Sequence, residues 1–414
     1  MNLLDIDVKE AALGFGDDEW EPPSSFPDLT GYDRISIDLE TRDPNITTLG
    51  PGWCRDDGYV IGYAVAAGDF VGYYPVRHED GNLPEKLVVN WLKKQLATPK
   101  IEKVMHNAMY DLGWLRWAGI EVQGPIIDTM IAAPLLNENR RFYNLNSLTG
   151  EYLGEYKNEK MLRAAAAMYH VDPKSDMWRL PSKFVGSYAE QDAAVTLRLW
   201  DRLRVDIKQD EVTSIFELES SLLPVLLEMK TKGVRVDIDG AEKIQKDLQI
   251  REKKLLEEIR ADTGVTVEPW AAASVAKAFD ALGLKYHRTE GTDAPSFTKQ
   301  FLSNHPHPIA KKIVKLREFN KANTTFVETI LEHSCNGRIH CDFNPLRSDE
   351  GGTVTGRFSS SHPNLQQIPA RDPEIKSMIR GLFLPEEGTQ WGSFDYASQE
   401  PRWLAHYCAQ LTGV

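Results

Sequence analysis

Arg34-Ile-Ser-Ile-Asp-Leu-Glu40 alternates apolar and polar side chains, the pattern of a β-strand with one buried face. Residues 59–67 and 70–76 have strand character as well and resemble antiparallel partners of this segment. Residues 85–96, 109–117 and 189–207 then place apolar side chains at helical intervals. Strands followed by interleaved helices predict a mixed α/β domain that ends near Lys208.

The segments on either side of this domain have a different character. Residues 1–30 are acidic, contain Glu21-Pro-Pro-Ser-Ser and have no clear period, so we predict a loosely ordered arm. Beyond residue 208, helices are predicted at 215–229, closed by Gly233, and at 238–262, 273–282 and 308–333. The alanine run 164–167 is expected to belong to a helix. The part from residue 209 to 414 is therefore expected to be mostly helical.

Length and composition limit the class of protein. A chain of 414 residues with 42% hydrophobic content can form more than one core. It has no apolar run of about 18 residues and no signal peptide, which predicts a soluble cytoplasmic protein without a membrane span. The four cysteines form no CxxC pair, so neither a disulfide framework nor a zinc site is expected.

The net charge of −13 argues against a uniformly basic nucleic-acid-binding surface. One locally basic stretch could follow a phosphate backbone, and it contains Lys299, Lys311, Lys312, Lys315, Arg317 and Lys321. On charge alone, a solvated helix face is the better interpretation of this stretch.

The carboxylates at three places in the chain suggest metal chemistry. Asp38 and Glu40 share one face of a strand because side chains alternate with period two. Tyr188 and Asp192 stand four residues apart on a helix and project from adjacent turns. Taken alone, Asp38 and Glu40 could simply lie on an exposed strand face, and Tyr188 and Asp192 could be an ordinary hydrogen-bonded pair on the surface of a helix. Asp111 lies at the margin of an apolar stripe, where either a metal ion or an arginine such as Arg116 would have to pair with it.

The order and spacing of these groups resemble the DEDD-type 3′→5′ exonucleases of the tyrosine subclass, over residues 31–208. The motifs are Asp38-Leu-Glu-Thr, Asn107 to Asp111 and Tyr188 to Asp192, as in the proofreading domain of the DNA polymerase I family. The resemblance implies a ribonuclease H-like domain that acts on single-stranded DNA 3′ ends. It also implies two divalent cations, Mg²⁺ or Mn²⁺, held by Asp38, Glu40, Asp111 and Asp192. Tyr188 would orient the attacking water, and Asn107 would contact DNA.

Residues 209–414 resemble the thumb and the first part of the palm of family A DNA polymerases. The resemblance rests on Leu227 to Asp237, Gly337 to Pro345 and the long run Thr353 to Pro369. It implies primer–template contacts by Arg357, Asn364 and Gln366. In the segment beginning Phe394-Asp395, it implies a metal-binding Asp395, a Glu400 below the sugar of the incoming nucleotide, and the closing Arg402. Ala397-Ser398 departs from the usual Ser-Gln at this turn.

The chain stops at Val414, before any fingers helix or second polymerase carboxylate. We therefore expect that this polypeptide alone does not polymerise DNA. In an alternative hypothesis, it is the DNA-binding half of a split polymerase completed by a second polypeptide, with an unpaired strand edge exposed near residues 391–394. A third hypothesis, an RNA-trimming nuclease of related type, is disfavoured by the run from Thr355 to Pro369.

Overall fold

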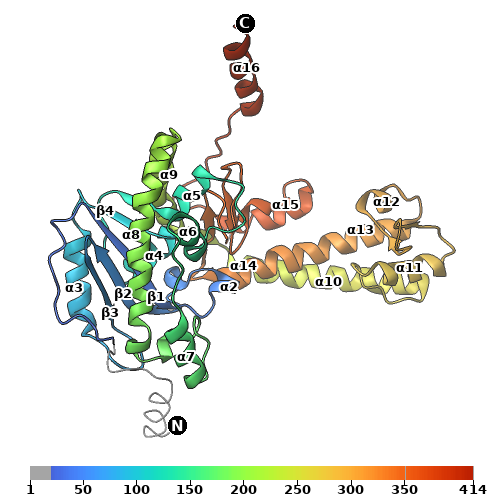
Figure 1. Cartoon of the computed structure of the whole chain (residues 1–414). Helices are drawn as coiled ribbons and strands as arrows, with labels where there is room; N and C mark the ends of the chain where they lie inside the picture. The colour runs from blue at the N-terminus through green and yellow to red at the C-terminus, as the bar shows by residue number, and fades with distance from the viewer. Residues whose placement is uncertain (1–19, 350, 414) are drawn as a thin grey trace.

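A computed structural model describes residues 20–349 and 351–413 of the chain. Figure 1 shows a sheet flanked by helices, a pair of long helices that runs away from the sheet, and a last helix that stands apart. Residues 1–19, the main part of the predicted acidic arm, lie outside the described residues. Within the described part, no helix is both long enough and apolar enough to cross a membrane.

The sheet has the strand order β3-β2-β1-β4-β5. The strands are β1 (Arg34–Arg42), β2 (Tyr59–Ala67), β3 (Phe70–Pro75), β4 (Glu102–Met105) and β5 (Ile126–Asp128). The first three pair antiparallel, whereas β4 and β5 run parallel to β1. The three antiparallel strands and the mixed α/β class are confirmed. The short parallel strands were not predicted, because runs of three or four residues buried on both faces carry no alternation.

Helix α8 (Gly186–Gln209) packs across β1, β2 and β3 and carries two of the predicted site residues. It begins three residues before the predicted start. The predicted α3 (Glu85–Leu96) and α4 (Ala108–Trp117) are present, and the alanine run lies in α7 (Lys160–Tyr169) as expected. Other elements of this part are α2 (Ile46–Leu49), α5 (Thr129–Leu136), α6 (Leu145–Tyr152) and the 3₁₀ turns Gly52–Cys54, Met177–Arg179 and Ser182–Phe184.

Residues 20–30 pack on the sheet domain, contrary to the loosely ordered arm expected for them. Phe26 stacks on Tyr74 with ring centroids 5.5 Å apart. Leu29 is buried, and its backbone N–H donates to Gln95 Oε1 at 2.8 Å. The acidic composition misled the prediction because a few apolar side chains supply the burial that orders the segment.

The two long helices α10 (Ile238–Thr263) and α13 (Pro308–Lys321) lie side by side and carry a small core at their far end. Helices α11 (Ala272–Ala281) and α12 (Lys299–Asn304), with strands β7 (His287–Arg288) and β8 (Pro295–Ser296), close this end. The helix predicted over 308–333 is interrupted by a π-helical turn at Ala322–Val327 before α14 (Glu328–His333). Three of the six residues of the basic stretch form ion pairs, namely Lys299, Lys312 and Lys315, which supports the solvated-face interpretation.

The rest of the chain contains a second sheet of order β13-β6-β10-β9. The strands of this sheet are β6 (Val234–Val236), β9 (Ser334–Cys335), β10 (Arg338–Ile339) and β13 (Phe383–Leu384). The other elements of this part of the chain are α9 (Thr213–Lys232), the hairpin β11 (Asp342–Asn344) with β12 (Ser359–Ser361), the 3₁₀ turn Leu365–Gln367, α15 (Pro373–Arg380) and α16 (Gln399–Thr412). Gly233 ends α9 with a positive φ of 60°, as predicted. The strand expected at 391–394 is absent. Trp391 and Phe394 are exposed, and although the Trp391 indole N–H donates to the Phe383 carbonyl of β13, the backbone of residues 391–394 pairs with none of the described strands.

Candidate metal-dependent nuclease site

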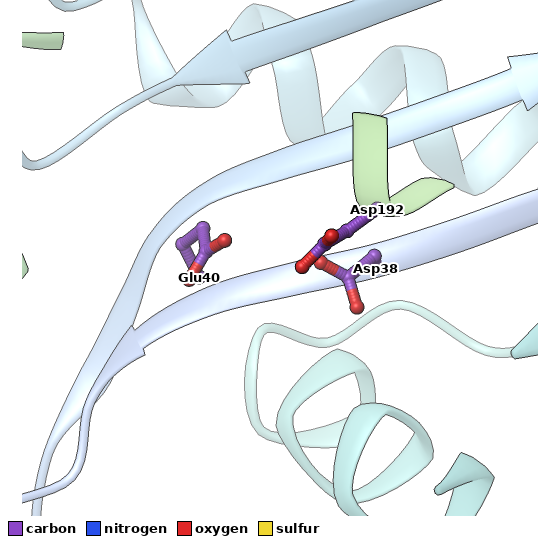
Figure 2. A group of neighbouring side chains, drawn as sticks. All are labelled: Asp38, Glu40 and Asp192. Atoms are coloured by element: carbon purple, nitrogen blue, oxygen red, sulfur yellow. The ribbon is translucent and has the colours of Figure 1, made fainter. Parts of the chain in front are cut away.

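Strand β1 and helix α8 bring three of the predicted carboxylates together. Asp38 and Glu40 lie on one face of β1, and Asp192 projects from α8 above that face (Figure 2). One carboxylate oxygen from each residue can be chosen so that all three lie within 4.8 Å of one another. We call these three residues the carboxylate cluster. The period of the strand and the position on the helix therefore bring together side chains more than 150 residues apart in sequence.

Asp111 lies beside the carboxylate cluster without being one of its three members. It is buried in α4, with 3% of its surface exposed, and the Leu39 backbone N–H on β1 donates to its carboxylate. Arg116, the alternative partner, instead forms an ion pair with Glu228. Of the two alternatives left open for Asp111, a metal ion or an arginine, Arg116 is therefore not the partner. Asp111 faces Asp38, whose charge adds to burial in raising the pKa of Asp111 well above its ordinary value.

Asp128 fixes the start of α4 and was missed by the sequence analysis. Its buried carboxylate accepts the backbone N–H groups of Asn107 at 3.0 Å and Ala108 at 2.8 Å. Asn107 adopts a left-handed conformation with φ of 70°, so the chain turns sharply before the helix that carries Asp111. The contact of the Asn107 side chain with DNA stays a prediction. An aspartate at a strand end gives no sequence signal for this role, because its partners lie 20 residues earlier.

Tyr188 stands one helical turn before Asp192 on α8 and is half-buried at the cluster. Burial, followed by the charges of Asp192, Glu40 and Asp38, raises the pKa of Tyr188. The phenol therefore keeps its proton and can donate a hydrogen bond to an oxygen nearby.

Lys157 is the cationic neighbour that the sequence analysis did not find. It lies between α6 and α7, and its Nζ contacts Asp192 Oδ2 at 2.6 Å. The same ammonium group is 5.4 Å from the centroid of the Tyr188 ring. The contact could not be predicted from the sequence, because Lys157 lies in an irregular loop 35 positions from Asp192.

The electrostatics of the cluster favour a bound cation. Burial and the charge of Asp192 raise the pKa of Asp38 to about 7, while Lys157 opposes the rise. Burial and the charge of Asp38 likewise raise the pKa of Glu40 well above its ordinary value. Asp192 Oδ1 is buried and has no hydrogen-bond partner among the described residues. Several carboxylate oxygens and an unsatisfied acceptor fit a hard cation such as Mg²⁺ or Mn²⁺.

The raised pKa of Asp38 is expected to make the stability of the folded protein depend on pH. Its pKa of about 7 in the folded state exceeds the value of 3.8 expected for an unfolded chain. The folded state then binds more protons than the unfolded state between these pH values, so the stability of the metal-free protein falls as pH rises from 4 to 7. Urea unfolding in EDTA should show a weaker fall in Asp38→Asn than in the unmodified protein. Equal slopes would contradict the assignment.

The residues predicted to act in polymerisation do not converge on this cluster. Arg357 pairs with Glu400 of α16 at 3.0 Å, and both side chains are exposed. Asn364 and Gln366 hold the turn after β12, where the Gln366 N–H donates to Asn364 Oδ1 at 3.0 Å. Asp395 and Arg402 are exposed in the C-terminal segment. Their roles toward DNA and metal stay predictions.

Comparison with known proteins covers both halves of the chain. A model of 3′-5′ exonucleases matches residues 25–208, and a model of DNA polymerase family A matches residues 238–412. The DNA-directed DNA polymerase of Pseudomonas phage M6 is 39% identical over 94% of this chain and 61% of its own length. DNA polymerase DpoZ of Acinetobacter phage SH-Ab 15497 is 30% identical over 92% of this chain and 63% of its length. DNA polymerase I of Chloroflexus aurantiacus is 30% identical over 84% of this chain and 37% of its length.

The fold of a solved polymerase agrees with these matches. The structure described as the POL domain of Pol1 from M. smegmatis in complex with DNA primer-template and dNTP superposes with a TM-score of 0.71, at 22% identity, over 94% of this chain and 62% of that one. The chain spans about three fifths of the length of the phage relatives it matches. The chain therefore combines a domain that matches 3′-5′ exonucleases, residues 25–208, with part of a polymerase domain that matches DNA polymerase family A, residues 238–412.

Proposed function

We propose that this protein removes nucleotides from the 3′ ends of DNA by metal-dependent hydrolysis at the carboxylate cluster. The observation that carries the proposal is the convergence of Asp38, Glu40 and Asp192 within 4.8 Å, in the part of the chain matched by the exonuclease model. The buried, unpartnered oxygen of Asp192 supports a cation at this point. We take the nuclease domain as residues 31–208.

Each carboxylate has a distinct role in this proposal. Asp38, Glu40 and Asp192 would hold one Mg²⁺ or Mn²⁺ ion, and Asp38 with Asp111 would hold a second. When bound at these residues, such ions would supply a nucleophilic hydroxide and would neutralise charge on the leaving oxygen. Asp38 is suited to be the shared ligand, because both Asp192 and Asp111 approach it from different helices.

Tyr188 orients the attacking water in this mechanism rather than removing its proton. The raised pKa of its phenol, caused first by burial, keeps the hydroxyl group protonated and able to donate a hydrogen bond. A water held by this hydroxyl group would be close to Asp192, because Asp192 lies one turn further along α8.

The second part of the chain, residues 209–414, is proposed to bind primer–template DNA. The relatives are DNA polymerases by name, and the solved neighbour is described as a complex with DNA primer-template and dNTP. Arg357, Asn364 and Gln366 are the proposed duplex contacts. Glu400 and Arg402 would contact the nucleotide site, with Asp395 as a metal ligand. The relatives support neither a second polypeptide nor an RNA substrate, and their phage and bacterial origins suit a cytoplasmic location.

Digestion of a 5′-labelled single-stranded DNA oligonucleotide tests the nuclease proposal. With Mg²⁺, the purified chain should yield a ladder that shortens from the 3′ end, whereas EDTA should prevent cleavage. The double variant Asp38→Ala/Glu40→Ala should be inactive because it lacks two of the cluster's carboxylates. An RNA oligonucleotide of the same sequence, run in parallel, should be cut more slowly. Equal cleavage by the double variant, or in EDTA, would refute the proposal.

A further inference from the structure

The ammonium group of Lys157 binds one carboxylate oxygen of Asp192, a proposed metal ligand. It contacts Asp192 Oδ2 at 2.6 Å, and only 16% of the lysine side chain is exposed. Its charge also acts on the other two members of the carboxylate cluster, since it opposes the rise in the pKa of Asp38 and of Glu40. The lysine thus offsets part of the negative charge of all three carboxylates.

The loop that carries Lys157 is fastened to the nuclease domain on both sides. The Lys157 backbone N–H donates to Asn146 Oδ1 at 2.9 Å. The Asn158 N–H donates to Gln191 Oε1 at 2.8 Å, and Gln191 Nε2 donates to the Tyr156 carbonyl at 3.2 Å. Gln191 immediately precedes Asp192 on α8. The helix that presents the carboxylate therefore also anchors the loop that presents the ammonium group.

We propose that Lys157 is a built-in counter-cation of the carboxylate cluster, and that a divalent ion must displace its ammonium group from Asp192 in order to bind. The inference rests on the proposed function only in treating the cluster as a metal site. A divalent ion and an ammonium group bound to the same carboxylate would lie close together and would repel each other strongly. The lysine therefore weakens metal binding but stabilises the folded protein when no metal is bound.

The affinity of the protein for Mn²⁺ shows whether Lys157 acts as a counter-cation or only packs against its neighbours. Replacing Lys157 with methionine keeps an unbranched apolar stem and removes the charge, so calorimetric titration should show Mn²⁺ binding about tenfold tighter than in the unmodified protein. Lys157→Arg keeps the charge and should bind Mn²⁺ with nearly unmodified affinity. Lys160→Met, at an exposed position three residues away, is the matched control. Unchanged or weaker binding in Lys157→Met would overturn the proposal.

Thermal unfolding of the same variants gives a second readout. In EDTA, Lys157→Met should melt at a lower temperature than the unmodified protein, because the cluster has lost its counter-cation. Saturating Mn²⁺ should remove this difference, since ligand binding to the folded state raises stability. A purely structural lysine would leave the same deficit with and without metal, and this result would overturn the proposal.

A measurement on the unmodified protein covers the case in which the methionine variant does not fold. Reductive methylation followed by mass spectrometry should label Lys157 slowly in EDTA and at least several-fold faster in saturating Mg²⁺, whereas the exposed Lys160 should not change. Equal labelling of Lys157 in both conditions would contradict displacement. If calorimetry finds no Mn²⁺ binding to the folded unmodified protein, the nuclease proposal itself fails. This result is distinct from metal binding that Lys157 does not affect.

Discussion

Replacement of Asp38 by asparagine is expected to lower the rate of 3′-end hydrolysis by about a thousandfold or more. Asp38 is the carboxylate that faces both Asp192 and Asp111, so its loss weakens both proposed metal positions at once. Metal ions contribute several kcal/mol to the stabilisation of such a transition state, and each 1.4 kcal/mol corresponds to about tenfold in rate. Asparagine keeps the size of the side chain, which limits any change in packing.

Single-turnover digestion of a labelled oligonucleotide measures this loss directly. DNA affinity, followed by fluorescence anisotropy, should be largely retained, because the change removes a negative charge and no cation. Asp33→Asn, at an exposed carboxylate just before β1, is the control and should keep full activity. A variant at Asp38 that cleaves at more than a tenth of the unmodified rate would exclude this residue as the shared ligand.

The carboxylate cluster could be predicted from the sequence because local geometry determines it. Period two on β1 places Asp38 and Glu40 on one face, and a separation of four on α8 places Tyr188 beside Asp192. The resemblance to known exonucleases supplied the pairing of these segments. The structure was needed to show that Asp38 and Glu40 on β1 lie close to Asp192 on α8, because tertiary packing brings the strand and the helix together.

Lys157 and Asp128 could not be predicted, because each acts through partners distant in sequence and sits in no periodic pattern. Lys157 reaches Asp192 from a loop, and Asp128 holds the backbone at Asn107 through two amide hydrogens. The strand at 391–394 was expected from the resemblance and not from a local pattern. In the structure the Trp391 indole N–H donates to the Phe383 carbonyl of β13, but the backbone of this segment pairs with none of the described strands.

The junction between the two parts of the chain contains a buried ion pair that should be far more important for stability than the surface pairs. Lys230 on α9 is 4% exposed and pairs with Asp342 of β11. Its ammonium group also lies 5.2 Å from the ring centroid of Trp53, which belongs to the sheet domain. His362 Nδ1 contacts the same aspartate at 2.8 Å. Burial acts to raise the pKa of Asp342, but His362 and Lys230 outweigh it, so the pKa lies below its ordinary value.

Substitution of Lys230 by methionine is therefore expected to destabilise the protein by about 3 kcal/mol, because the largely buried carboxylate of Asp342 loses its ion pair and keeps the contact with His362. Guanidinium unfolding followed by circular dichroism should show the loss as a lower midpoint. Lys232→Met is the matched control, since Lys232 lies two residues further along α9 with 66% of its side chain exposed. Its effect should stay within about 0.5 kcal/mol.

A second substitution decides whether the lost stability comes from the negative charge of Asp342 or from the lost packing of the Lys230 side chain. In Lys230→Met/Asp342→Asn, the buried negative charge is removed together with its cation, so much of the lost stability should return. Recovery in the double variant would identify the negative charge of Asp342, left without Lys230, as the cause. A double variant as unstable as the sum of its single changes would instead mean that Lys230 stabilises the junction through its contact with Trp53.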